Sequence, residues 1–121
     1  GEGTSAGEQC NGGAVMTNIV INIGPDTMKL FMSGHACYRM DGNDVVCSAV
    51  SVLGQALADA MFHTPDIRST AKMEKGNLFL EAHYRKEQRE YIKNRMAVAL
   101  SGFQMLQNAY PENVSYTCQE G

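Results

Sequence analysis

A cysteine and a histidine that flank one glycine-containing segment are the residues best placed for covalent chemistry. Cys47 lies three residues after Asp44, where apolar residues with helical spacing begin. A helix start favours a thiolate, because its backbone N–H groups lack partners and carry positive charge, and such thiols reach pKa values of about 3.5–7.5. His35 lies near the other end of segment 34–43, which has no apolar period and is expected to be a loop. The spacing predicts a nucleophile and its base, although a helical cysteine is also often just a small buried side chain.

Two hairpins and two helices are expected to position this pair. The first hairpin is predicted at 17–23 and 28–32, where apolar residues occupy every second position: Ile19, Ile21, Ile23, Met28, Leu30 and Met32. After the loop, three- and four-residue apolar spacing predicts a helix that ends near His63, with Asp44 as its N-cap.

The second half of the chain repeats this order and adds a strand. Apolar and polar residues alternate over 67–73 and 78–84, on either side of Gly76-Asn77, which predicts another hairpin. Helical spacing over 87–109 ends before Pro111, and 113–118 is rich in strand-forming residues. The order ββαββαβ predicts an α+β two-layer sandwich, in which two helices cover one face of a mixed sheet.

The composition fits one small domain. The chain has 121 residues, 44% of them hydrophobic, which is too short for two ordinary domains. Residues 1–15 are glycine-rich and lack the basic and apolar regions of a secretory signal. We interpret them as an added or disordered leader, and 16–121 as a single domain. No uninterrupted apolar run approaches the ~20 residues that cross a bilayer, so no membrane is expected.

The number of cysteines and the net charge limit which cellular compartment and which binding partners are expected. One of the four cysteines, Cys10, lies in the leader, and the odd number that remains argues against a disulfide framework. We therefore expect the reducing cytoplasm. The formal charge of −3 gives no general attraction to the phosphates of nucleic acids.

Segment 34–53 resembles the signature of the ribosomal-processing cysteine protease (Prp) family of bacteria. The family pattern is similar to G-H-A-x-Y followed by G-x-D-[IV]-V-C-[AS]-[AG]-V-S. The matching residues are Gly34-His35-Ala36, Tyr38, Gly42, Asp44-Val45-Val46-Cys47, Ala49-Val50-Ser51 and Leu53. Val45 and Ser48 are minor departures from it. The element order, Tyr110-Pro111 and the length from Met16 also resemble the family.

The resemblance implies a cysteine endopeptidase with a Cys47–His35 dyad and no cofactor. The family removes the N-terminal extension of a large-subunit ribosomal protein, the twenty-seventh, during ribosome assembly, and its members form homodimers. For this chain the resemblance therefore implies a peptide substrate and a second copy as partners. It implies contact with nucleic acid only through the ribosome.

The resemblance also gives supporting roles to Asp44 and Ser51. Asp44 would orient His35 or only cap the helix, and Ser51 would bind substrate or dyad, or bond back to the carbonyl of Cys47. Acyl transfer needs oxyanion donors, and the backbone N–H groups of Val46 and Cys47 are candidates.

The loop itself offers two glycines as hinges. Gly34 and Gly42 lie near its two ends, so the segment between them could close over a bound peptide. The alternative is a simple surface connection.

Other functions fit the sequence less well. His35, Cys37 and Cys47 lack the paired C-x-x-C spacing of a zinc site, so no metal is expected. The five basic residues between Arg85 and Arg95 alternate with Glu87 and Glu90, which favours a solvated helix face over an RNA patch. A non-enzymatic ribosome-assembly binding module and a redox sensor that uses Cys37 and Cys47 stay as alternatives.

Overall fold

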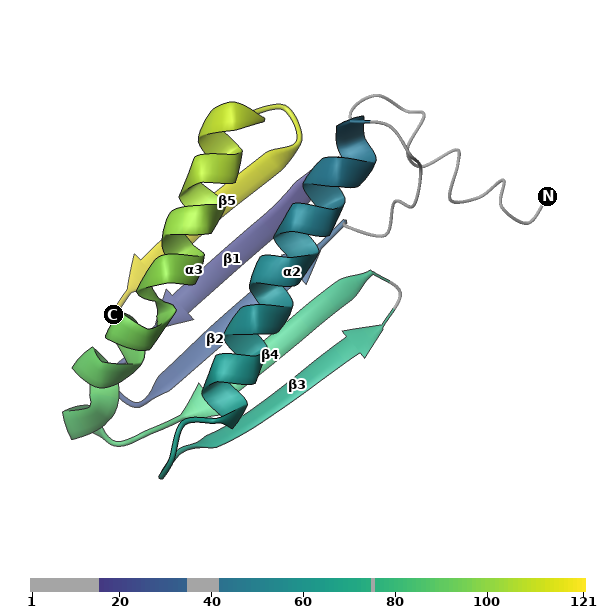
Figure 1. Ribbon diagram of the computed structural model, residues 1–121. Helices are drawn as coiled ribbons and strands as arrows, with labels where there is room; N and C mark the ends of the chain where they lie inside the picture. The colour runs from purple at the N-terminus through teal and green to yellow at the C-terminus, as the bar shows by residue number, and fades with distance from the viewer. Residues whose placement is uncertain (1–15, 35–41, 75) are drawn as a thin grey trace.

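The structure, a computed structural model, describes residues 16–34, 42–74 and 76–121. One five-stranded sheet, in the order β3-β4-β2-β1-β5, carries α2 and α3 on one face, and its other face has no helix over it in the described part of the chain (Figure 1). The elements follow the order ββαββαβ. This confirms the predicted α+β two-layer sandwich.

The first hairpin supplies the centre of the sheet. β1 (Thr17–Ile23) and β2 (Thr27–Ser33) pair antiparallel, with Ile21 opposite Leu30. The residues predicted to alternate toward the core are all buried: Ile19, Ile21, Ile23, Met28, Leu30 and Met32. The period-two pattern therefore reports the covered face of the sheet correctly.

Three further strands extend this hairpin on both sides. β4 (Asn77–His83) pairs antiparallel with β2, and β3 (Arg68–Glu74) pairs with β4 and forms one edge. β5 (Val114–Glu120) pairs parallel with β1 and forms the other edge, so the sheet is mixed, as predicted.

The helices approach the sheet and each other at positions without side chains. α2 spans Gly42–Phe62 and α3 spans Arg89–Ala109, preceded by the short 3-10 helix η1 (Lys86–Gln88). A Cβ atom on Gly54 would lie 2.5 Å from the sulfur of Met32, and one on Gly102 would lie 2.7 Å from a methyl group of Leu53. Because these two glycines have no side chain, α2 can lie close to the sheet and α3 can lie close to α2. The side chains between the layers are fully buried, among them Val50, Leu57, Met61, Ile92, Met96 and Phe103.

The first helix begins earlier than the sequence predicts. Asp44 is the third residue of α2 and not its N-cap, because the helix starts at Gly42. Apolar spacing starts only at Val46, so periodicity carries no information about the turn before it. Cys47 is consequently the sixth residue of the helix and lies in its second turn.

One helix in the described part of the chain resembles a membrane span in its length and composition. The Val45–Phe62 part of α2 is long and apolar enough to cross a membrane, with a mean hydropathy of 1.7. Isolated polar residues divide the segment, so it contains no long uninterrupted apolar run. One such helix is weak support for membrane insertion, since a core helix passes the same test, and α2 packs Val46, Val50 and Leu57 into the core.

Gly34, directly after β2, has a backbone conformation that favours glycine. Its φ is +84°, and a Cβ atom there would lie 2.4 Å from the carbonyl oxygen of Met16. The hydroxyl of Thr17 also donates to the carbonyl of Gly34, at 3.4 Å. The chain that leaves β2 toward His35 is therefore fixed against the start of β1.

We predict that Gly34→Ala lowers the free energy of unfolding by about 1–3 kcal/mol, because it adds a left-handed strain and a backbone clash. Urea denaturation followed by circular dichroism measures the change. Gly121→Ala is the control, since no atom lies within 4 Å of its Cβ position, and it should stay within about 0.5 kcal/mol of the unsubstituted protein. Equal stability of the two variants would show that Gly34 is not constrained.

Candidate active site

Cys47 lies on one side of α2, almost completely buried. Its exposed fraction is 5%, and it shares a helix face with Ser51, Gly54 and Ala58, which follow at spacings of three and four residues. We call this row of four residues the Cys47 stripe. A buried thiol on a helix face can be a packing residue or a protected nucleophile, so its surroundings decide which role is available to it.

At Gly54 the Cys47 stripe faces β2 and β4, away from α3. Leu53 packs on Gly102 of α3, whereas a Cβ atom on the next residue, Gly54, would lie 3.0 Å from a methyl group of Leu78 on β4. Because successive helical residues differ by about 100°, these two contacts fix the rotation of α2 about its axis.

The start of α2 and the end of β2 lie at the same end of the sheet (Figure 1). α2 runs opposite to β2, and Gly54 lies over Met32. From that contact the helix extends about 10 Å back to Cys47, and the strand extends about 7 Å forward to Gly34. Cys47 therefore lies close to the level of Gly34, which follows β2 directly and precedes His35 in the chain.

Several predicted site residues fall outside the described part of the chain. These are His35 and Cys37, together with the side chain of Asp44. The dyad, the orienting role of Asp44, the Cys37–Cys47 redox pair and the absence of a metal stay predictions. Gly42 is the first residue of α2, so the predicted hinge there would lie at the junction of loop and helix.

Ser51 is held by a neighbour that the sequence analysis missed. The side-chain amide of Gln55 donates to the Ser51 hydroxyl oxygen at 2.8 Å. A hydroxyl that accepts one bond keeps its own proton for donation. The four-residue spacing of Ser51 and Gln55 on a helix is a signal from which this pair can be predicted.

The predicted oxyanion donors occupy regular helical positions. In a helix that begins at Gly42, the N–H groups of Val46 and Cys47 point toward the carbonyls of Gly42 and Asn43. Only the first four N–H groups of a helix lack such partners. Val46 and Cys47 are therefore not among the unpartnered N–H groups on which the prediction was based, and their role as oxyanion donors stays untested.

Cys118 is a poor nucleophile by comparison. It lies half-buried on β5, and burial raises the pKa of its thiol above the ordinary value. Burial likewise raises the pKa of the neighbouring Tyr116 to about 12. Both side chains stay protonated at neutral pH, which makes Cys118 a packing residue.

The basic segment of α3 is engaged within the chain. Lys93 forms an ion pair of 2.8 Å with Glu120, and this contact raises the pKa of Lys93 and lowers that of Glu120. Arg89 donates to the carbonyl of Gly24 at 3.1 Å, and Arg95 donates to that of Ala60 at 3.2 Å. Three of the five basic residues are thus bonded within the chain, and the choice of a solvated helix face over an RNA patch stays a prediction.

Solved structures share the fold. The SMU.848 protein from Streptococcus mutans is 22% identical, with a TM-score of 0.72 over 91% of this chain and 99% of that chain. The essential ribosomal processing protease Prp from S. aureus, in complex with a substrate peptide, is 16% identical, with a TM-score of 0.67 over 86% of this chain and 100% of that chain. The same S. aureus protease with a covalently linked product peptide is 18% identical, with a TM-score of 0.65 over the same shares of the two chains.

The sequence itself gives the family. A search of curated proteins returns no significant match. Residues 16–115 match the sequence profile of the family described as Cysteine protease Prp. This match covers most of the chain, including Cys47 and the whole of segment 34–53. The chain is therefore a member of the Prp family of cysteine proteases.

Proposed function

We propose that the protein is an endopeptidase in which Cys47 is the nucleophile and His35 is its base. The observation that carries this proposal is the position of Cys47, near the start of α2 and close to the level of Gly34, the residue directly after β2. Gly34, the last described residue before His35, is fixed against Met16, so the point from which the chain continues is defined.

The proposed reaction is acyl transfer through a thioester. The Cys47 thiolate attacks the scissile carbonyl, and the His35 imidazolium gives its proton to the leaving amine. Water then attacks the thioester, His35 takes its proton, and the thiol and the new carboxyl terminus are released. Ser51, oriented by Gln55, is placed one turn from Cys47, from where its hydroxyl can donate to the substrate.

The proposed substrate is the N-terminal extension of the twenty-seventh large-subunit ribosomal protein. Membership in the Prp family supports it, and the S. aureus relative was solved with a substrate peptide. We place the activity in the cytoplasm, where ribosomes assemble.

We further propose that two copies associate through the outer face of α2 and α3. Val52 on α2 and Met105 on α3 are 65% and 69% exposed, and Val98, seven residues before Met105, is 82% exposed. A seven-residue spacing of apolar side chains suits packing against another helix. A groove of about 620 Å³ between the helices has an almost wholly apolar lining that includes Leu53 and Leu106, and a second copy would offer the same surface in return.

Replacement of the proposed nucleophile should separate activity from folding. We predict that Cys47→Ala cleaves the N-terminal peptide of the ribosomal protein precursor more than about 1,000-fold more slowly, with a loss of stability near 1 kcal/mol. Mass spectrometry of the peptide and thermal unfolding measure the two quantities. Cys118→Ala is the matched control and should keep its activity, while undiminished cleavage by Cys47→Ala would rule the proposal out.

The proposed dyad predicts a pH shift in thiol reactivity. An imidazolium beside a thiol favours the thiolate, so its removal in His35→Ala should move alkylation of Cys47 by iodoacetamide to higher pH, by about one to three units. Peptide mass spectrometry at a series of pH values follows Cys47 specifically. His83→Ala is the control, because His83 lies 2.7 Å from Glu81 on β4, far along the sheet from the start of α2. An identical profile for His35→Ala would mean that the two side chains do not interact.

The proposed interface predicts a change in oligomeric state. Sedimentation should show a dimer for the unsubstituted chain and a monomer for the double variant Val52→Lys, Met105→Lys, because four charges would be brought into one apolar contact. Val20→Lys, a substitution on the uncovered face of the sheet, should stay dimeric. A double variant that sediments as the unsubstituted chain does would place any association elsewhere.

A further inference from the structure

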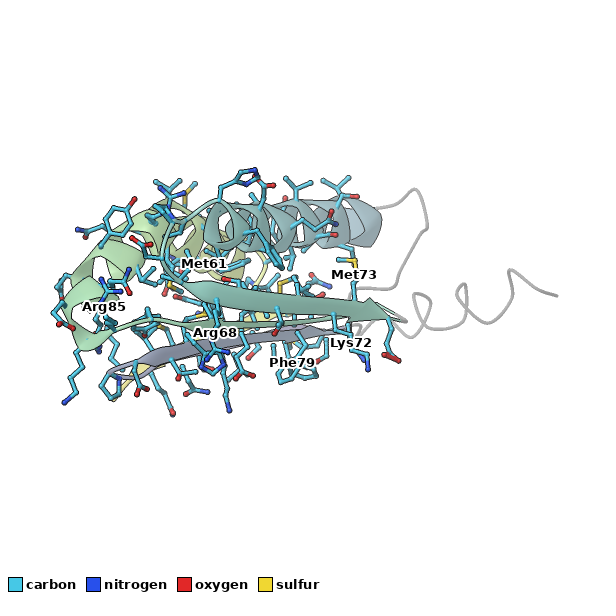
Figure 2. The ribbon with its side chains drawn as sticks, turned by 90° about the horizontal axis from the view of Figure 1, so that it is seen from below. Met61, Arg68, Lys72, Met73, Phe79 and Arg85 are labelled. Atoms are coloured by element: carbon cyan, nitrogen blue, oxygen red, sulfur yellow. The ribbon has the colours of Figure 1, made fainter. Side chains whose placement is uncertain are left out.

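The helix layer leaves the inner face of β3 open. Met73 and Ala71 lie opposite Leu78 and Leu80 of β4, so all four side chains belong to the face that carries the helices. Leu78 and Leu80 are buried, whereas Met73 is 49% exposed and Ala71 is also exposed. Figure 2 shows Met73 on the side of α2, and Lys72 and Phe79 on the opposite side of the sheet. Met73 is therefore an exposed apolar side chain on the helix side of the sheet.

This open face lies beside α2 and widens toward the start of that helix. Near its end, α2 contacts β3, where the Ser69 hydroxyl donates to the carbonyl of Met61 at 3.4 Å. At Gly54, two turns before Met61, α2 lies over Leu78 and Met32, on β4 and β2. The helix thus leaves β3 as it is followed back toward Cys47 (Figure 1).

The open face is continuous with the Cys47 stripe. Gly54 lies over Leu78, and Met73 is the direct cross-strand neighbour of Leu78, about 5 Å away. Along the helix, Cys47 lies about 10 Å from Gly54. An extended peptide advances about 3.3 Å per residue, so a chain bound at Cys47 reaches Met73 within about three or four residues.

We infer that Met73, with Ala71 beside it, forms a subsite for an apolar side chain of the substrate, about three or four residues from the scissile bond. The inference rests on the proposed function, because it requires that Cys47 bind the scissile bond. The occupant is a segment of the peptide substrate, since the surface joins the proposed nucleophile directly.

The chemistry of the subsite favours an uncharged substrate side chain. The three inner-face residues of β3, Ser69, Ala71 and Met73, carry no charge. The nearest charged residues of the strand, Lys72 and Glu74, alternate to the other face and pair with each other at 3.3 Å. A thioether is adaptable in shape and is favourable toward aromatic and aliphatic groups, whereas a substrate carboxylate would lose water here without gaining a partner.

The test measures peptide binding in a Cys47→Ala background, so that no cleavage occurs. The probes are fluorescein-labelled versions of the ribosomal precursor peptide, with Leu, Glu or Lys at each position two to five residues from the cleaved bond, on either side. Fluorescence anisotropy should show, at one position, about tenfold tighter binding of Leu than of Glu. Met73→Lys should reverse this preference at the same position, and Met73→Leu should keep it. Lys72→Met, on the same strand but the opposite face, is the matched control and should change nothing.

The outcomes separate the subsite from the protease function. If the background variant binds the peptides and Met73→Lys keeps their order of affinity, the subsite is wrong, while loss of cleavage on Cys47→Ala still supports the proposed nucleophile. Met73→Lys could instead change the sedimentation of the protein without changing its preference among the peptides. That result would show that this face is a contact between two copies, and it would overturn the inference. Equal thermal unfolding of the Met73 variants, expected for a half-exposed side chain, shows that the fold is intact.

Discussion

The close approach of α2 to the sheet at Gly54 is the contact on which the site depends. A Cβ atom at Gly54 would lie 2.5 Å from Met32 and 3.0 Å from Leu78, so any larger residue would push the helix outward or displace both side chains. With the helix in place, Val46 and Val50 are buried in the core and Cys47 is only 5% exposed. Gly54, which lies two turns from Cys47 and approaches β2 and β4, thus determines how deeply the Cys47 thiol is buried.

The pairing of β5 with β1 determines which sheet edge is available to a substrate. β5 is anchored by Lys93 and Arg89 of α3, which both pair with Glu120, and by the bond from Gly121 N–H to the carbonyl of Ile23. β1 therefore becomes an interior strand, and α3 lies over the β5 side. The opposite edge, β3, receives less cover, and it is the edge next to the Cys47 stripe. One edge of the sheet, β5, is therefore closed by contacts with α3, whereas the inner face of β3 stays exposed at Ala71 and Met73.

Helix α2 has three faces with different surroundings, and these explain why it contains few charged residues. One face packs on the sheet, a second packs on α3 through Leu53 and Gly102, and the third carries Cys47 and Ser51. All three favour apolar or small residues, and in Val45–Phe62 only Asp59 is charged. A mean hydropathy of 1.7, high enough for a membrane segment, thus arises partly from residues packed on the sheet and on α3 and partly from the exposed Val45, Val52 and Phe62.

The sequence alone determined the elements, the fold class and the family of this protein, together with the candidate pair His35 and Cys47. Period-two and three-to-four spacing depend on local geometry, and segment 34–53 carries its signature in consecutive residues, so neither needs distant contacts. Only the tertiary structure decided that β5 lies parallel to β1, that α2 begins before Asp44, and that Met73 is exposed although Leu78 beside it is buried. These features depend on strand pairing between distant residues and on the crossing of a helix over a twisted sheet. Alternation of side chains shows that Met73 and Leu78 share a face, but the extent to which α2 covers that face is fixed by Gly54, some twenty residues away in the chain.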